Sequence, residues 1–301
     1  MMNGIIVVKK EQGFTSFDVV AKLRGICGQK KIGHTGTLDP DAEGVLPVCL
    51  GNATKVCDML TDSDKEYEAV MLLGVETDTQ DTSGTVLVQK PTDHLLEEMV
   101  LSVIRSFVGP IKQIPPMYSA LKVNGQKLCD LARAGITVER KARDIMVYGI
   151  DIVSVELPRV TMRVKCSKGT YIRTICHDIG QKLGCGAAME HLTRTRAAGY
   201  TLEQALTLAE IQSRKDEGIL ENIVRSVDEV FVTYPALYTN TEGHRMLMNG
   251  NALYPNCFKK VEPEHFESMV RVYDKDGHFC AIYKYNREKE CFKPEKMFLS
   301  K

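Results

Sequence analysis

The sequence predicts a mixed α/β (α+β) protein with one large domain and a small β domain at its carboxyl-terminal end. The chain has 301 residues, which is enough for a full hydrophobic core and for more than one domain. Patterns typical of helices and strands alternate up to about residue 230, and short aromatic strands follow. Apolar residues make up 44% of the chain and charged residues 26%, as in folded proteins.

The first 90 residues are predicted to hold four strands and one helix. Residues 4–10, GIIVVKK, form an apolar run typical of a short strand. Ser16 can act as the N-cap of a helix that fades near Gly28. The inner face of this helix is expected to carry Phe17, Val20, Leu23 and Cys27. A loop then leads into the strand VLPVCL, and further strands are expected at 66–75 and 84–89, separated by the turn TDTQDTSG.

The middle of the chain is predicted to contain a helix followed by an irregular loop. Thr92 or Asp93 can cap a helix that runs to Phe107 and ends before Gly109. Its inner face is expected to hold Leu96, Val100, Val103, Ile104 and Phe107. The stretch IPPMYSALKVNGQK follows, and its prolines and glycine indicate a loop.

The strand predicted at residues 159–166 has the clearest pattern in the chain. Apolar residues alternate strictly with polar ones, so one face is expected to be core and the other basic. Thr170 is a candidate cap for the next helix, which Gly184 would end. Seven basic residues fall close together here and form either a local basic face or an ordinary solvated surface: Arg159, Arg163, Lys165, Lys168, Arg173, Arg194 and Arg196.

Composition and motifs exclude several classes of protein. The formal net charge is zero, which argues against a protein that binds nucleic acid through bulk charge alone. Glycine-rich nucleotide motifs, HExxH and GxSxG are absent, and TDTQDTSG lacks the acidic ladder of a calcium loop. The ten cysteines form no CxxC pair, so reduced thiols in the cytoplasm are expected. No signal peptide or membrane span is expected, and any chemistry is predicted to use side chains alone.

The stretch GHTGTLDPDAEGVLPVCLG contains the strongest candidate for a reactive side chain, Asp39. Pro40 restricts Asp39 to an extended backbone, and Gly36 permits a tight turn before it. A carboxylate held in this way can attack an anomeric carbon, although an Asx turn or a helix cap explains the same residues. Asp41 and Glu43 are candidates for the second acid of a glycoside hydrolase. The residues alone leave these alternatives open.

A resemblance to a known family covers roughly residues 3–205. GHTGTLDP with the following GVLPVCLGNATK resembles the signature of the TruB family of tRNA pseudouridine synthases. The segments NGIIVVKKEQGFTSFDVV, DKEYEAVMLLGVETDTQDTSG, QIPPMYSALKVNGQK, CSKGTYIRTICHDIGQKLGCGA and HLTRTRAAGYTLEQA resemble further family blocks in the same order. The chain departs from the pattern at Asp41, Glu43 and Cys129, where similar sequences usually carry an apolar residue, threonine and tyrosine.

The resemblance implies a pseudouridine synthase fold, with a central mixed or antiparallel sheet flanked by helices. It implies a catalytic domain at residues 1–230, with an RNA-gripping loop at about 110–145. Residues 231–301 would form a small PUA-like, β-barrel-like RNA-binding domain. The catalytic residues implied are Asp39, Tyr67 and Arg173, and the substrate-binding residues are His34, Tyr171, Leu192, Lys55 and Asp81, with Lys65 as a further phosphate contact.

The implied reaction is the conversion of uridine to pseudouridine at position 55 of the tRNA T loop. It requires that the target base be flipped out of its stack, and His34 would take the place of that base. The tRNA T stem-loop would be the partner of a cytoplasmic monomer that needs no protein partner, cofactor or metal. Two alternatives remain: a tRNA-binding or folding module without catalysis, and a guide-RNA-dependent subunit of a larger particle.

Overall fold

The computed structural model describes residues 1–299, and its largest element is a nine-stranded mixed sheet. Seven strands follow the order β1-β3-β12-β4-β11-β10-β7, while β2 pairs with β3 and β13 pairs with β12. The strands are β1 (Gly4–Lys10), β2 (Ile32–His34), β3 (Glu43–Leu50), β4 (Lys65–Leu73), β7 (Gly109–Gln113), β10 (Arg143–Glu156), β11 (Arg159–Cys166), β12 (Ala187–Ala197) and β13 (Tyr200–Thr201). The central sheet flanked by helices that the sequence predicts is thereby confirmed.

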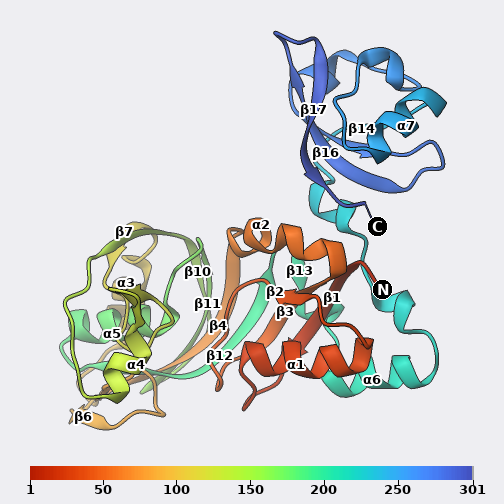
Figure 1. Ribbon diagram of the computed structural model, residues 1–301. Helices are drawn as coiled ribbons and strands as arrows, with labels where there is room; N and C mark the ends of the chain where they lie inside the picture. The colour runs from red at the N-terminus through yellow and green to blue at the C-terminus, as the bar shows by residue number, and fades with distance from the viewer. Residues whose placement is uncertain (300–301) are drawn as a thin grey trace.

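Helices cover the two ends of this sheet separately (Figure 1). At the β1 end, α1 (Ser16–Cys27) and α6 (Leu208–Asp216) pack on β1 and β3 in one apolar cluster. At the β10 end, α3 (Glu97–Arg105) and α5 (Ile172–Leu183) pack in a second cluster with β4, β10, β11 and β12. Strands β4 and β12 therefore lie between two cores, in the middle of the sheet.

The N-cap of the first helix is one residue earlier than the sequence predicts. Thr15, not Ser16, is the N-cap: its hydroxyl accepts from the Asp18 amide at 3.0 Å while Asp18 accepts in return. Phe17, predicted to face the core, is 63% exposed, and Val19 and Ile26 are buried instead. The buried apolar stripe of this helix is Val19, Val20, Leu23 and Ile26, which share the helical spacing and leave Phe17 outside it.

The caps predicted for the next two helices are also wrong. Helix α3 starts at Glu97 with Leu96 as an exposed N-cap residue, so neither Thr92 nor Asp93 caps it. Helix α5 starts after Tyr171, and the Thr170 hydroxyl donates to the Ser167 carbonyl at 2.9 Å within the preceding turn. The end predicted at Gly184 is confirmed, because this glycine has the left-handed φ of 76° that closes the helix.

The region predicted as irregular contains short regular pieces. Strands β8 (Lys122–Val123) and β9 (Gln126–Lys127) form a small hairpin, and α4 (Leu128–Arg133) follows. Outside the main sheet, β5 (Val75–Thr77) and β6 (Val86–Gln89) form a second small hairpin on either side of the turn predicted there. No helix within residues 1–299 is long and apolar enough to cross a membrane.

The carboxyl-terminal part forms a four-stranded sheet in the order β14-β15-β16-β17. Its elements are β14 (Ala236–Tyr238), α7 (Thr241–Met248), β15 (Met269–Tyr273), β16 (Phe279–Asn286) and β17 (Cys291–Met297). The sheet packs around an apolar cluster of its own. Strands β14 and β17 are not paired with each other in the described chain, so the predicted barrel-like module is an open sheet.

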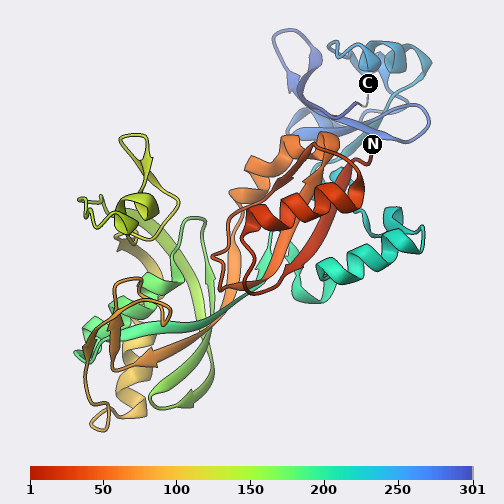
Figure 2. The same cartoon turned by 60° about the horizontal axis from the view of Figure 1, so that its bottom comes forward.

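This carboxyl-terminal sheet is docked firmly on the large one beside the 3₁₀ helix η1 (Gly51–Val56) and α2 (Cys57–Thr61), as Figure 2 shows. Ile282 and Phe298 share an apolar cluster with residues of β1, β3, η1 and α2. The Asn52 amide donates to the Phe298 and Leu299 carbonyls at 3.0 and 2.6 Å. The two sheets are therefore held by a common core and by polar contacts around it.

We expect Phe298→Ala to lower the free energy of unfolding by about 3 to 5 kcal/mol, because it removes a large buried side chain from the shared cluster. Phe17→Ala is the matched control, since that ring is exposed, and its cost should stay within about 1 kcal/mol. Urea unfolding of both variants measures the difference. Equal costs for the two variants would contradict the docking described above.

Candidate active site

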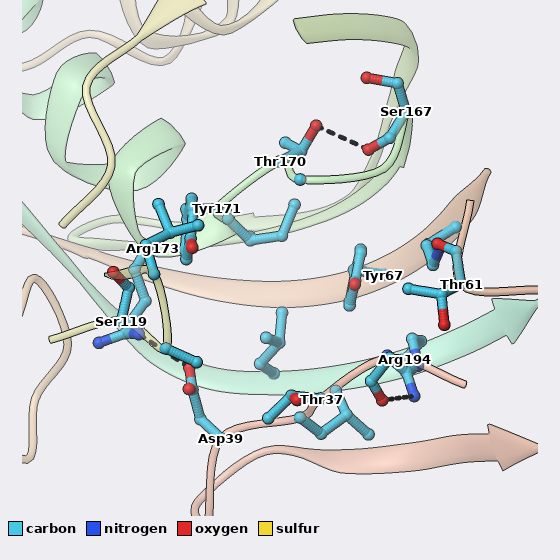
Figure 3. Close-up of a pocket in the computed structure, with 18 residues that line it drawn as sticks. Thr37, Asp39, Thr61, Tyr67, Ser119, Ser167, Thr170, Tyr171, Arg173 and Arg194 are labelled. Carbon is cyan, nitrogen blue, oxygen red and sulfur yellow. Dashed lines mark hydrogen bonds and ion pairs between the residues drawn. The ribbon is translucent and has the colours of Figure 1, made fainter. Parts of the chain in front are cut away.

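A pocket of about 380 Å³ opens on the middle strands β4 and β12 of the main sheet (Figure 3). Five of the eight catalytic and substrate-binding residues implied by the resemblance line it: Asp39, Tyr67, Tyr171, Arg173 and Leu192. They come from the loop before β3, from β4, from the start of α5 and from β12. His34, Lys55 and Asp81 do not line this pocket.

Asp39 lies at the pocket wall with its carboxylate directed toward Arg173 (Figure 3). The distance from Arg173 Nη2 to Asp39 Oδ2 is 3.0 Å, and 45% of the Asp39 side chain is exposed while Arg173 is almost fully buried. Partial burial in the cleft raises the pKa of Asp39 above its ordinary value, and the guanidinium of Arg173 opposes this rise. The nearby Asp81 raises the Asp39 pKa further.

The buried guanidinium of Arg173 joins three segments that are distant in sequence. Besides Asp39, it donates to the carbonyls of Thr79 at 3.1 Å and Tyr118 at 2.8 Å, and it contacts the Asp81 carboxylate at 3.2 Å. A buried charge of this kind needs several partners, because each one replaces hydration lost on folding. Arg173 therefore ties the loop that carries Asp39 to the turn at Asp81 and to the long loop at Tyr118.

Asp81 uses its carboxylate within the protein. Its Oδ1 accepts from the Thr79 hydroxyl at 2.7 Å and from the amide and hydroxyl of Ser83 at 3.1 and 2.5 Å. Its Oδ2 faces Arg173 at 3.2 Å. The turn that the sequence indicates at this position is confirmed, and the same turn presents an acid to Arg173.

The backbone on both sides of Asp39 is held by buried donors. The ammonium of Lys10, which is fully buried at the end of β1, donates to the carbonyls of Pro40 at 3.1 Å and Ala42 at 2.6 Å. On the other side, the Leu38 amide donates to the Ser16 hydroxyl at 2.9 Å. Burial lowers the pKa of Lys10 to about 8. Lys10 is a positioning residue that the strand pattern of residues 4–10 did not identify.

The floor of the pocket is formed where β4 and β12 run antiparallel. Tyr67 of β4 stands opposite Arg194 of β12, and burial raises the pKa of the Tyr67 phenol. Arg194 is fully buried and donates through Nε to the Val45 carbonyl at 2.7 Å. Leu192 adds an apolar wall two residues before it. The sequence predicts that Arg194 lies in a basic or solvated face. Its burial was not foreseen because it depends on pairing between distant strands.

The start of α5 is fixed to β7 by a side-chain amide. The Tyr171 amide donates to Gln113 Oε1 at 2.8 Å, and Gln113 Nε2 donates to the Tyr171 carbonyl at 3.0 Å. This reciprocal pair replaces a side-chain cap, and it places Tyr171 and Arg173 on the pocket side of the helix start. Burial raises the pKa of Tyr171.

The expected basic contacts are arranged differently from the prediction. Lys55 donates to the Met297 carbonyl at 2.7 Å, so it holds the carboxyl-terminal sheet, and Lys65 is buried in the pocket wall with its pKa lowered to about 8 by burial. Within the predicted basic face, four members pair with acids: Arg159 with Glu190, Arg163 with Glu68, Lys168 with Asp62, and Arg173 with Asp39 and Asp81. Much of that face is therefore electrically balanced.

His34 ends β2, just before the loop that carries Asp39. Burial lowers the pKa of its half-buried imidazole, so the ring is neutral near pH 7. Its buried Nδ1 has no hydrogen-bond partner among residues 1–299, and no group of acids, histidines and cysteines there is arranged to hold a metal ion.

Known proteins resemble this chain over nearly its whole length. The sequence model of the TruB family pseudouridylate synthase N-terminal domain matches residues 24–172, and that of the tRNA pseudouridylate synthase B C-terminal domain matches residues 173–232. The tRNA pseudouridine synthase B of Lachnoclostridium phytofermentans is 52% identical over 99% of this chain and 100% of its own length. That of Clostridium perfringens is 43% identical over 99% of both chains. A chain solved in a Cbf5–Nop10–Gar1 complex superposes with a TM-score of 0.72 at 27% identity, over 98% of this chain and 85% of its own.

The chain is that of a pseudouridylate synthase, and its fold is that of the chain in the Cbf5–Nop10–Gar1 complex. Within that class, the chain belongs to the TruB family.

We expect Asp81→Asn to move the acidic limb of the pH–rate profile to lower pH. The ionised Asp39 carboxylate is taken as the reactive form, so activity is lost as the pH falls through the Asp39 pKa. Removing the Asp81 charge takes away one cause that raises this pKa, and it leaves Arg173 with fewer acidic partners. Single-turnover formation of pseudouridine across acidic pH measures the shift.

Asp78→Asn is the control, because Asp78 lies in the same turn but accepts from the Thr85 amide and does not contact Arg173. Its profile should match that of the wild type. A limb that stays in place or moves to higher pH in Asp81→Asn contradicts the electrostatic arrangement.

Proposed function

We propose that this protein acts on uridine 55 of the tRNA T loop, with Asp39 as the residue that reacts. As a member of the TruB family whose full-length relatives are tRNA pseudouridine synthases, it is an isomerase that converts uridine to pseudouridine in tRNA. The observation that carries the assignment of the site is the Asp39 carboxylate, held 3.0 Å from buried Arg173 at the pocket. The reaction detaches the base from C1′ and rejoins it through C5, so it consumes no cofactor, metal or water.

The pocket suggests a role for each residue that lines it. Asp39 acts as nucleophile or base, and Arg173 favours its ionised form. Tyr67 stacks on the flipped base, while Tyr171 and Leu192 provide a hydrogen-bonding and an apolar wall for the uracil. Asp81 belongs to the site as the acid that positions Arg173, because its carboxylate is already used within the protein.

His34 is proposed to fill the space that the target base leaves. Extruding a stacked base costs a few kcal/mol, and a flat ring in its place offsets part of that cost. A neutral imidazole at the edge of the Asp39 loop suits this role, since it can stack without carrying a charge into the base stack.

The chain is proposed to divide near residue 230. Residues 1–230 would form the catalytic domain, with the loop at about 110–145 gripping the RNA, and residues 231–301 would form a PUA-like RNA-binding domain. The separate apolar cluster of the carboxyl-terminal sheet supports this division. The docking contacts at Asn52 and Lys55 suggest that this domain is carried at a fixed place relative to the pocket.

Two acids that distinguish this chain are proposed to alter contacts with the RNA to different extents. Glu43 accepts from the Thr193 hydroxyl at 3.1 Å and lies 3.4 Å from His191 Nε2, so its charge is engaged. Asp41 is exposed beside the reactive loop. We expect Asp41 to repel nearby phosphates more than Glu43 does.

We also propose that the protein works as a monomer in the cytoplasm without an obligate protein partner or cofactor. Its ten free cysteines suit a reducing compartment. The likeness to a chain in a Cbf5–Nop10–Gar1 complex supports the guide-dependent alternative. The higher identity to tRNA pseudouridine synthase B over the full chain favours the stand-alone enzyme. Formation of pseudouridine on a bare T-arm RNA would support the stand-alone enzyme over the guide-dependent subunit. Binding without product would indicate the non-catalytic module.

We expect Asp39→Asn to lower the single-turnover rate by more than about a thousandfold, because the isosteric amide is neither a nucleophile nor a base. The dissociation constant for the T arm should stay within about threefold of wild type, because the substitution removes no positive side chain that contacts the RNA phosphates. Asp41→Asn, an exposed acid two residues away, is the control and should keep wild-type turnover. Comparable rates in Asp39→Asn and wild type would remove Asp39 from the chemistry.

We expect His34→Ala to slow the reaction on a folded T arm about tenfold, which corresponds to about 1.4 kcal/mol. On an RNA whose target uridine is already unstacked, the rate should be nearly unchanged, because no gap has to be filled. Single-turnover rates on the two RNAs make the comparison. Equal losses on both would exclude a role in base flipping.

A further inference from the structure

Two cysteines far from the pocket lie over the same pair of strands. Gly33 of β2 stands directly opposite Cys49 of β3 in their antiparallel pairing. The sulfur of Cys57, the first residue of α2, lies 3.2 Å from the point where a Cβ on Gly33 would stand. Residues opposite each other on antiparallel strands point to the same face, with their Cβ positions roughly 5 Å apart. The Cys57 sulfur therefore lies on the face from which the Cys49 side chain projects.

The apolar clusters support this placement independently. Cys49 belongs to the cluster beneath η1 and α2, and Cys57 packs against that same cluster. Val48 and Leu50, the neighbours of Cys49 in β3, belong to the cluster on the opposite face of the sheet. Because Gly33 has no side chain, the space between the two thiols is not filled by β2.

We propose that Cys57 and Cys49 form a peroxide-sensitive dithiol, in which Cys57 reacts first and Cys49 resolves it into an intramolecular disulfide. Cys57 is partly exposed at the start of α2, whereas Cys49 is completely buried. A small oxidant can therefore reach the Cys57 thiol, and the buried Cys49 thiol lies next to it.

The environment shifts the pKa values of the two thiols in opposite directions, as the proposed roles require. A hydrogen bond from Cys49 lowers the pKa of Cys57, and the same contact together with burial raises the pKa of Cys49. At other buried thiols burial outweighs the hydrogen bonds: it raises the pKa of Cys166 and Cys176 to about 12, although Thr170 opposes the rise at Cys166. Oxidation is therefore expected to select this pair.

The reaction balances with hydrogen peroxide as the oxidant. The Cys57 thiolate attacks one peroxide oxygen, the O–O bond breaks, and hydroxide leaves, giving a sulfenic acid on Cys57. The Cys49 thiol then attacks the Cys57 sulfur, forms the S–S bond and displaces the sulfenic oxygen, which departs as water once it has taken the thiol proton. In sum, two thiols and one peroxide give one disulfide and two waters.

The product would close a loop from Cys49 to Cys57 that contains η1. Asn52 and Lys55 lie within this loop and hold the carbonyls of residues 297–299 of the carboxyl-terminal sheet. The oxidised site is therefore located at the junction of the two sheets and is separate from the uracil pocket.

Treating the folded full chain with hydrogen peroxide, then alkylating free thiols before unfolding, tests the proposal. Mass spectrometry should find a product lighter by two hydrogens, with peptides containing Cys49 and Cys57 joined. In Cys49→Ala, the disulfide should be absent and dimedone should trap a sulfenic acid on Cys57. In Cys57→Ser, neither product should form on Cys49. Cys176→Ala, which removes a different buried thiol, should still form the disulfide at the wild-type rate.

Three results would overturn the proposal: no disulfide in the wild type, a disulfide between other cysteines, or dimedone labelling spread evenly over several thiols. Circular dichroism of each variant before oxidation confirms that loss of the product does not reflect loss of the fold.

Discussion

The active site depends on one buried positive charge. Arg173 enters the interior at the start of α5, where only 5% of it is exposed, and such a charge is stable only if polar groups surround it. Those groups come from the Thr79–Asp81 turn, from Tyr118 and from Asp39. Satisfying the guanidinium thus brings together three loops that the sheet alone would leave apart. The position of Asp39 over the pocket is a consequence of this requirement.

The carboxylate of Asp39, which is proposed to react, is subject to opposing electrostatic effects. Burial and the neighbouring Asp81 raise the Asp39 pKa, whereas Arg173 and Lys10 lower it. Lys10 and Ser16 also fix the backbone of the loop on both sides of Asp39. The position of the Asp39 side chain therefore does not depend only on its ion pair with Arg173. A carboxylate that is positioned in this way, and only half exposed, is less strongly hydrated and better able to react.

The sequence predicted several of the main elements and five of the eight proposed site residues at the pocket, and the reasons for its failures are physical. The β11 strand was exact in its bounds because its alternation records one buried face, and Gly184 marked the end of α5 through its left-handed backbone. Lys10 and Arg194 were missed because their burial depends on strands that pair across 30 or more residues. Phe17 was misplaced because α1 offers two overlapping apolar stripes, and the one through Val19, Val20, Leu23 and Ile26 is buried. The contact of Lys55 with Met297 was not foreseen because Met297 lies at the other end of the chain.

Replacing Arg173 with lysine tests the central role of this residue most directly. Lysine keeps the charge, but it lacks the planar fork that reaches Thr79, Asp81, Tyr118 and Asp39 together. The single-turnover rate of Arg173→Lys on a folded T arm should fall about a hundredfold while the dissociation constant for the RNA stays within about threefold of wild type. A rate within about threefold of wild type, in a folded variant, would show that charge alone suffices and that the convergence of loops on Arg173 does not govern the site.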